Sequence, residues 1–554
     1  MIVPALFFYL LIIAPSGSEY CFHNQCGIYF WGVHGFDGIW HLAIINIAFR
    51  HFPFQAPTFA GANMTGYNYL FDLILYVFTF TGIPAITWYF KIFPLVWFIV
   101  FTGLLIALAR KIKDSPRFVA LTLFFMYFAG SFSYLLTLYH HQTIWGSAGQ
   151  LATIAVHTMS NLQFAFSIPI LLWMLIIVKR NKIDGKIVLS LAILNFINLG
   201  IKFYGGAITS FLAAIFIFFH LVKKNFRQMF VYEIVTMIAA GLAVFVFYDP
   251  LAATKTGAIF TVAPFALIHT ITEEPDLLYS QTLTNARYFL ITKGIGPKLI
   301  LIEMFNFTAF VFFYLGVRFF GLLYVLYKII RKKMDSFSWY VLLTIIFATL
   351  LSSVLVQKAE WWNVVQFFYY AIFLSAIFIA QLTDQLLAQK NTIMKLLVVI
   401  IIILAVPTSV DVVKSYAVFP GAAYVPQKEL SALTFLKNQP PGIVLVPLFD
   451  ESFHQGNGPF ALANYADTAY VSAFTGKQTY FAALHPIRLM DIDYRDRLKL
   501  LQAGNCTVLN HVNYLYEIPS LTKLNGFAKC SQKMEKIYAN DTITIYRLFP
   551  KRAE

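Results

Sequence analysis

The sequence predicts a polytopic α-helical membrane protein, with about eleven transmembrane helices and a small α/β domain at the C-terminal end. The first reason is composition: 59% of the 554 residues are hydrophobic and only 12% are charged, whereas soluble proteins average about 45–50% apolar and about 25% charged residues. The second is that apolar stretches of about 20 residues, long enough to cross a bilayer, recur along the chain. The third is that basic residues cluster between these stretches. The net charge of +15 therefore indicates membrane topology and argues against a nucleic-acid partner.

The spans are expected where apolar residues run without interruption. Residues 1–14 form the first span; this stretch is short for a crossing, which leaves open that its cytoplasmic end precedes residue 1. It lacks the basic region and cleavage site of a signal peptide. The further spans are predicted at about 92–109, 117–136, 160–178, 186–201, 204–222, 228–248, 306–327, 338–356, 361–383 and 393–410.

Loop charge orients these spans. Two stretches, near 36–50 and 66–81, are expected to be interfacial helices of the first outer loop rather than crossings. With 66–81 on the outer surface, all five basic runs fall inside, as positive-inside loops require. These runs are Arg110, Lys111, Lys113 and Arg117; Lys179, Arg180, Lys182 and Lys186; Lys223, Lys224 and Arg227; Lys328, Arg331, Lys332 and Lys333; and Lys390 and Lys395. We therefore predict a multi-pass protein of the cell membrane with a cytoplasmic N terminus.

The chain is expected to divide at residue 410. Residues 1–410 would form the transmembrane domain, with a first outer loop at 15–91 and a large outer loop at 249–297 that is long enough to act as a binding element or lid. Residues 411–554 carry many more charges, and an odd number of crossings places them outside the cytoplasm. A helix-like stretch at 429–438 precedes the buried-strand pattern IVLVPL, which predicts a small α/β domain.

All four cysteines fall outside the cytoplasm on this topology. Cys21 and Cys26 lie near the start of the chain, and Cys506 and Cys530 lie near its end. Two local disulfides, Cys21–Cys26 and Cys506–Cys530, are compatible with an oxidising compartment. Four free thiols are the alternative.

The first outer loop holds the first candidates for chemistry. In HGFDGIWH, Asp37 and His41 are four residues apart, which places them on one face of a helix. A carboxylate at the membrane surface can act as a general base toward a hydroxyl or amine, or it can hold a divalent cation together with His41. The structural alternative is that Asp37 begins an interfacial helix and His41 is a solvated or internally bonded imidazole.

In layout, the chain resembles the GT-C superfamily of integral membrane glycosyltransferases, whose members include protein O-mannosyltransferases and aminoarabinose transferases. The stretch GYNYLFDLILYVFTFTGIPAITWYFKIFPLVWFIVFTGLLIALARKI looks like their passage from a surface helix into the second span. ELSALTFLKNQPPGIVLVPL and AYVSAFTGKQTYFA look like the tail of bacterial members. The resemblance implies that Asp37 is the catalytic base or a metal ligand and that Asp72 is a second acidic residue. Unlike the family pattern, Asp37 is followed by Gly38 rather than by a second acid, which puts a two-carboxylate metal site in question.

The resemblance also implies a polyprenyl-phosphate-linked sugar donor, whose phosphate needs a cation at membrane-surface depth. Lys202, with Tyr204 two residues later, lies at the outer end of a span; its alternative role is to snorkel to the interface. Lys358, Asn363 and Gln366 lie among aromatic residues and could bind sugar or phosphate, or they could belong to an interfacial belt.

Arg318 is the basic residue near the middle of a predicted span, and an intramembrane charge is by default a functional hypothesis. It could reach a lipid phosphate, pair with Glu233 or line a crevice. The leading hypothesis is an inverting transferase that moves a sugar from polyprenyl phosphate to a lipid, glycan or protein acceptor outside the cytoplasm, with a divalent metal ion as an optional cofactor. A transporter or flippase, for which Arg318 is the argument, and a non-catalytic relative that binds lipid-linked glycans are the alternatives.

Overall fold

The computed structural model describes residues 1–549 except for 148–154, 222–225, 254–258, 455–457, 522–526, 528–529 and 531–533. Lys223 and Lys224 of the third predicted basic run lie outside the described residues, as does part of the predicted outer loop 249–297. The chain forms two compact units. The helical unit comprises Met1–Tyr9, Trp97–Val246 and Ala258–Ala417, and the mixed unit comprises Leu10–Val96, Phe247–Gly257 and Val418–Glu554.

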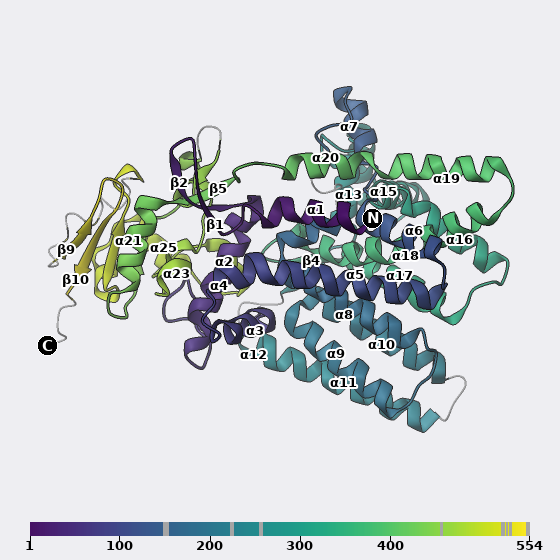
Figure 1. Ribbon diagram of the computed structural model, residues 1–554, viewed down its shortest axis with the longest axis horizontal. Helices are drawn as coiled ribbons and strands as arrows, with labels where there is room; N and C mark the ends of the chain where they lie inside the picture. Colours follow the sequence, from purple (N-terminus) through teal and green to yellow (C-terminus); the bar gives the residue numbers. More distant parts are fainter. Residues whose placement is uncertain are drawn as a thin grey trace. The chain divides into compact units, whose positions relative to one another are not determined.

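The helical unit consists almost entirely of helices (Figure 1). It contains most of α5 (Phe93–Ile112) and most of α11 (Phe226–Tyr248). Its other helices are α6 (Pro116–Tyr127), α7 (Ser133–His141), α8 (Leu162–Val178), α9 (Gly185–Ile201), α10 (Phe203–Leu221), α13 (Ala266–Glu273), α14 (Gln281–Ile291), α15 (Pro297–Leu315), α16 (Arg318–Ile330), α17 (Ser336–Val354), α18 (Val365–Ala388), α19 (Thr392–Ala405) and α20 (Pro407–Tyr416). The strands β3 (Phe260–Val262) and β4 (Leu355–Gln357) form a two-stranded sheet. The first residues of α1 (Ile2–Ile13) also belong to it.

Helix α18 is the core of this unit. Nearly every residue from Val365 to Ala380 is buried, as expected of a helix that is apolar on all sides and surrounded by others. It packs against α6, α10, α16, α17 and α19. Helices α8, α9 and α10 lie side by side, and side-chain caps at Asn161 and Asp184 fix the starts of α8 and α9.

Among the described residues, seven helices are long and apolar enough to cross a membrane: Ala85–Ile112, Phe203–Leu221, Phe226–Tyr248, Pro297–Leu315, Ser336–Val354, Trp361–Ala388 and Thr392–Tyr416. Ile2–Ile13, Leu70–Thr79, Pro116–Tyr127, Leu162–Val178 and Gly185–Ile201 are shorter apolar helices. The protein is therefore an integral membrane protein. The count of about eleven crossings stays a prediction, and so do the sidedness of the termini and the division at residue 410.

Two predicted spans are interrupted. The prediction of one continuous span over 306–327 is wrong, because α15 ends at Leu315 and α16 begins at Arg318. Gly316 between them has φ +56°, and a Cβ there would lie 2.5 Å from the carbonyl oxygen of Gly130, so the break requires glycine. The prediction of a span over 117–136 is also wrong in its extent, because α6 ends at Tyr127 and α7 begins at Ser133.

The mixed unit contains two four-stranded sheets. The first has the order β1-β2-β5-β7, built from β1 (Ser18–Phe22), β2 (Gln25–Phe30), β5 (Ala423–Pro426) and β7 (Phe460–Ala461). The second has the order β6-β8-β10-β9, built from β6 (Val444–Leu445), β8 (Tyr514–Glu517), β10 (Thr544–Leu548) and β9 (Met534–Ala539). The sheets combine hairpins with the parallel pairs β5–β7 and β6–β8.

Most helices of this unit come from the two ends of the chain, and α12 comes from its middle. They are α2 (Asp37–Ile47), α3 (Leu70–Thr79), α4 (Ala85–Thr87), α12 (Pro250–Ala253), α21 (Gln427–Lys437), α22 (Leu462–Tyr465), α23 (Tyr470–Thr475), α24 (Leu484–Leu489) and α25 (Arg495–Gln502). Antiparallel pairing of β2 with β5 and packing of α2 against α23 join the segment 15–91 to the tail. These contacts place the first loop and the tail in one compact body.

Candidate functional site

Most of the candidate residues singled out by the sequence form two polar groups in the structure, and each group lies within one unit. The first is in the mixed unit, where α2 begins at Asp37. An acidic residue in the first turn is favourable because the N-terminal end of a helix carries partial positive charge. Contrary to the expectation of an interfacial helix, α2 is buried on nearly all sides. Helix α3 fits that expectation better, since Val77 and Phe78 are exposed.

His41 lies between two carboxylates. Its Nδ1 lies 3.1 and 3.2 Å from the two carboxylate oxygens of Asp72, and its Nε2 lies 3.8 Å from Oδ2 of Asp37. The His41 and Asp72 side chains are fully buried, whereas the side chain of Asp37 is 26% exposed. The ring of His41 also stacks on that of Tyr89 at a centroid distance of 5.7 Å. The structure thus brings Asp37, His41 and Asp72 together in a chain that runs from the interior to an accessible carboxylate.

Gly38 is required by packing. A Cβ at this position would lie 2.7 Å from the ring carbons of Phe90, so no larger residue fits without displacing that ring. This explains why Asp37 is not followed by a second acidic residue. The second carboxylate of the cluster comes instead from Asp72 on α3.

Asp37 also lines a small pocket that includes tail residues. Phe36, Asp37 and Tyr67 from the first loop meet Asp467 and His485 from the tail there. The carboxylate of Asp467 accepts hydrogen bonds from the backbone N–H groups of Ala483 at 2.8 Å and Leu484 at 2.6 Å, which fixes the turn that carries His485. Sequence reasoning missed Asp467 and His485, because nothing local marks two tail residues more than 400 positions from Asp37 as its neighbours.

The electrostatics of this pocket keep Tyr67 protonated. Burial, together with the negative charges of Asp37 and Asp72, holds the pKa of the Tyr67 phenol well above its ordinary value. Burial also raises the pKa of Asp467, although its backbone hydrogen bonds and the nearby His485 oppose the effect. Tyr67 is therefore a hydrogen-bond donor in the same pocket as Asp37.

A metal role for Asp37 stays a prediction. Among the described residues, no group of three or more His, Cys, Asp or Glu side chains has the arrangement of a metal site. With Nδ1 facing Asp72, His41 has one remaining nitrogen toward Asp37.

The second group lies in the helical unit and links two segments that are far apart in sequence. The hydroxyl of Tyr204 donates a hydrogen bond to Oε1 of Gln357 at 2.7 Å. The amide of Asn363 donates to the same oxygen at 3.1 Å, and Gln366 donates to Asn363 at 3.2 Å. Lys202 is buried, with its Nζ 3.4 Å from Oδ1 of Asn161 and 5.7 Å from the centroid of the Tyr204 ring.

The Lys202 group therefore combines a buried ammonium with a row of amides and a phenol. Tyr204, Asn363 and Gln366 belong to it, although the sequence offered Lys202 and the segment 357–366 as separate candidates. Gln357 joins it through the hydrogen bonds above. Lys358 follows Gln357, and its side chain is exposed.

Arg318, for which the sequence left three roles open, is enclosed by protein in the helical unit. It is 2% exposed, and its guanidinium donates hydrogen bonds to the carbonyl oxygens of Phe125 at 3.2 Å, Gly130 at 3.4 Å and Ala129. The described residues show no ion pair between Arg318 and Glu233. Arg318 thus binds the carbonyl group of Phe125 in the last turn of α6, where helix carbonyls lack intrahelical partners, and two carbonyl groups of the segment that follows α6.

Both local disulfides are present in the structure. Cys21 is bonded to Cys26 across the hairpin of β1 and β2, and Cys506 is bonded to Cys530. The second bridge joins two segments 24 residues apart, which restricts the unfolded chain more than the first.

Comparisons with known proteins give one kind of match. No family model matches the chain, and no curated protein sequence matches it. Among solved structures, the chain is similar to ArnT from Cupriavidus metallidurans bound to undecaprenyl phosphate, with 10% identity and a TM-score of 0.47. The apo state of the same protein gives 9% identity and a TM-score of 0.47. Each match covers 98% of this chain and 96% of that chain.

Proposed function

We propose that this protein is a membrane glycosyltransferase of the GT-C type, which transfers a sugar from a polyprenyl-phosphate donor to a hydroxyl or amine acceptor. The observation that carries the proposal is the Asp37–His41–Asp72 chain, in which two buried groups lie behind one accessible carboxylate. A general base must reach its substrate while its charge and orientation are fixed by groups behind it. The residue pattern that resembles the GT-C superfamily supports the same assignment.

In this proposal, Asp37 removes the proton from the acceptor as the acceptor oxygen or nitrogen attacks the anomeric carbon. The bond from that carbon to the phosphate oxygen breaks, and the polyprenyl phosphate leaves with the electron pair. Attack from the face opposite the phosphate inverts the anomeric configuration. His41 and Asp72 act as positioning residues, because they touch Asp37 or each other rather than the reacting atoms.

Lys202 is assigned to the phosphate of the donor. The phosphate gains negative charge as the bond breaks, and a fixed cation stabilises that charge most where water is excluded. Lys202 is buried and surrounded by amide and phenol groups that can hydrogen-bond to phosphate oxygens. Asp467 and His485, which share the pocket of Asp37, are assigned to the acceptor.

The test uses the full-length protein in vesicles with a panel of radiolabelled polyprenyl-phosphate sugars. Release of polyprenyl phosphate with a labelled acceptor supports the proposal. Movement of intact donor across the bilayer would identify a flippase, and binding without either would identify a non-catalytic relative. Asp37→Asn lowers turnover about 10²- to 10⁴-fold in the proposed enzyme, whereas Asp496→Asn, which changes an exposed acidic residue in the first turn of α25, leaves it unchanged.

A further inference from the structure

A second polar site lies in the helical unit, where the ends of six helices meet. An open pocket of about 410 Å³ is lined by residues from the end of α5, the start of α6, the end of α8, α16, the start of α17 and the end of α18. Three lysines line it: Lys113, Lys179 and Lys328. Each belongs to a different one of the predicted basic runs, so the fold gathers three of these runs around one cavity.

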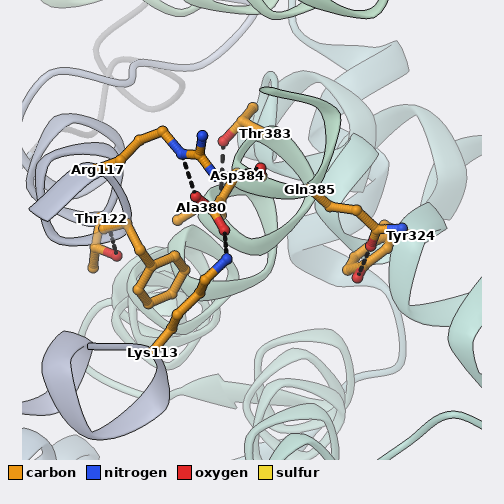
Figure 2. A network of polar contacts seen from close by, with 9 residues as sticks. Lys113, Arg117, Thr122, Tyr324, Ala380, Thr383, Asp384 and Gln385 are labelled. Carbon is orange, nitrogen blue, oxygen red and sulfur yellow. Dashed lines mark hydrogen bonds and ion pairs between the residues drawn. The ribbon is translucent and has the colours of Figure 1, made fainter. Parts of the chain in front are cut away.

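One acidic residue of the pocket is already neutralised. The carboxylate of Asp384 lies 2.5 Å from Nζ of Lys113 and 2.7 Å from Nε of Arg117 (Figure 2). The Asp384 side chain is only 4% exposed, whereas Lys113 and Arg117 are about half exposed. Two cations therefore share one buried anion, and the group carries excess positive charge.

The other acidic residue is committed to a helix start. Asp335 caps α17 by accepting a hydrogen bond from the backbone N–H of Ser338 at 3.2 Å, and Nζ of Lys179 lies 3.4 Å from its other oxygen. Nζ of Lys328 lies 3.4 Å from the hydroxyl of Ser338. Three lysines and two acidic residues line the pocket, and Arg117 adds a fourth positive charge through its ion pair with Asp384. The group as a whole therefore has a net charge of +2, which favours an anionic ligand.

The rest of the pocket suits a ligand with both charged and apolar parts. Ile112, Phe118 and Ala388 contribute apolar surface. The hydroxyl of Tyr324 donates to Oε1 of Gln385 at 2.5 Å (Figure 2), and the Lys328 ammonium lies 5.8 Å from the centroid of the Tyr324 ring. Long basic side chains at the ends of membrane helices attract anionic headgroups, because those headgroups give the membrane surface a negative potential.

We propose that this pocket binds the phosphate of an anionic lipid headgroup. The recognising chemistry is a phosphate group held by Lys179 and Lys328, with acyl chains along the apolar surface of the helix ends. Inorganic phosphate presents the same anionic group without acyl chains, so it serves as the comparison ligand. The site is separate from the Lys202 group, with which it shares no residue.

The experiment measures lipid binding to the purified full-length protein by native mass spectrometry, with phosphatidylglycerol, phosphatidylcholine and inorganic phosphate titrated separately. Each lysine at an anionic lipid surface contributes a factor of about five in affinity, so the double variant Lys179→Gln/Lys328→Gln is expected to bind phosphatidylglycerol roughly 25-fold more weakly. Lys333→Gln, an exposed lysine of the same basic run that does not line the pocket, is the matched control and keeps wild-type binding.

Lys179→Arg/Lys328→Arg keeps the charge and is expected to bind within about threefold of wild type, which separates loss of charge from loss of fold. Equal phosphatidylglycerol binding by the Gln double variant and wild type would overturn the proposal. Equal affinity of the wild-type protein for phosphatidylcholine and phosphatidylglycerol would also overturn it. Saturation by inorganic phosphate that displaces phosphatidylglycerol at millimolar concentration would reassign the pocket to a soluble phosphate.

Discussion

Asp384 is buried and its two cations are half exposed, so removing the cations is expected to destabilise the protein more than removing the anion. Replacing both cations in Lys113→Met/Arg117→Met leaves a carboxylate that is 4% exposed without the two ion pairs seen in the structure. An uncompensated buried charge of this kind costs about 3–5 kcal/mol. Replacing the anion in Asp384→Asn leaves two cations that are about half exposed and that water can solvate. That change costs about 1–2 kcal/mol, the value of two ion pairs near a surface.

The triple variant Lys113→Met/Arg117→Met/Asp384→Asn tests this reasoning directly. It is expected to be more stable than Lys113→Met/Arg117→Met by about 2 kcal/mol, because neutralising the whole group removes the stranded charge. Thermal unfolding in detergent, followed by intrinsic tryptophan fluorescence, ranks the variants. Arg110→Met/Lys111→Met, two exposed basic residues of the same run, is the control for loss of surface charge. A triple variant that is less stable than the double would refute the account, since the effects would then simply add.

Three other predictions follow from the sites. Asp72→Asn removes the charged acceptor of His41, and a charge-assisted hydrogen bond contributes about 1.5–3 kcal/mol. We therefore expect kcat to fall about 10- to 100-fold, with a shifted pH profile and little change in KM. A wild-type pH profile would exclude a positioning role for Asp72. Lys202→Gln is expected to raise KM for the donor about tenfold or more, whereas the control variant Lys182→Gln, which changes an exposed lysine, keeps the wild-type KM. An unchanged KM in both variants would show that Lys202 does not bind the donor. Burial raises the pKa of Glu429 above 4.5, although hydrogen bonds from Tyr470 and Tyr516 partly oppose this. The free energy of unfolding therefore falls as pH rises from about 4.5 through the raised pKa. Glu429→Gln is expected to increase the melting temperature at neutral pH, and a decrease would contradict the assignment.

Much of the helical architecture could be predicted because apolar length sets it. Residues 203–221 and 226–248 are helices close to the spans expected at 204–222 and 228–248. The break at Gly316 could not be predicted, because an isolated glycine in an apolar run is common in membrane helices. What requires it is the approach of Gly130, a contact between segments far apart in sequence.

The candidate site was predictable only where its geometry is local. The helical spacing of Asp37 and His41 places them on one face, and this pair is present in the structure. The participation of Asp72 and the pocket with Asp467 and His485 depend on tertiary packing. In the same way, Lys202 and the segment from Gln357 to Gln366 were separate candidates, and the fold links them through Tyr204.

The central claim is that Asp37 acts as the base of a glycosyl transfer from polyprenyl phosphate. The most direct measurement is the steady-state kinetics of Asp37→Asn in vesicles, with donor and acceptor varied separately. If the claim is correct, kcat falls about 10²- to 10⁴-fold, while KM for the donor stays within about threefold of wild type, because the asparagine keeps the shape of the side chain without its basicity. A variant that turns over donor at the wild-type rate would contradict the claim.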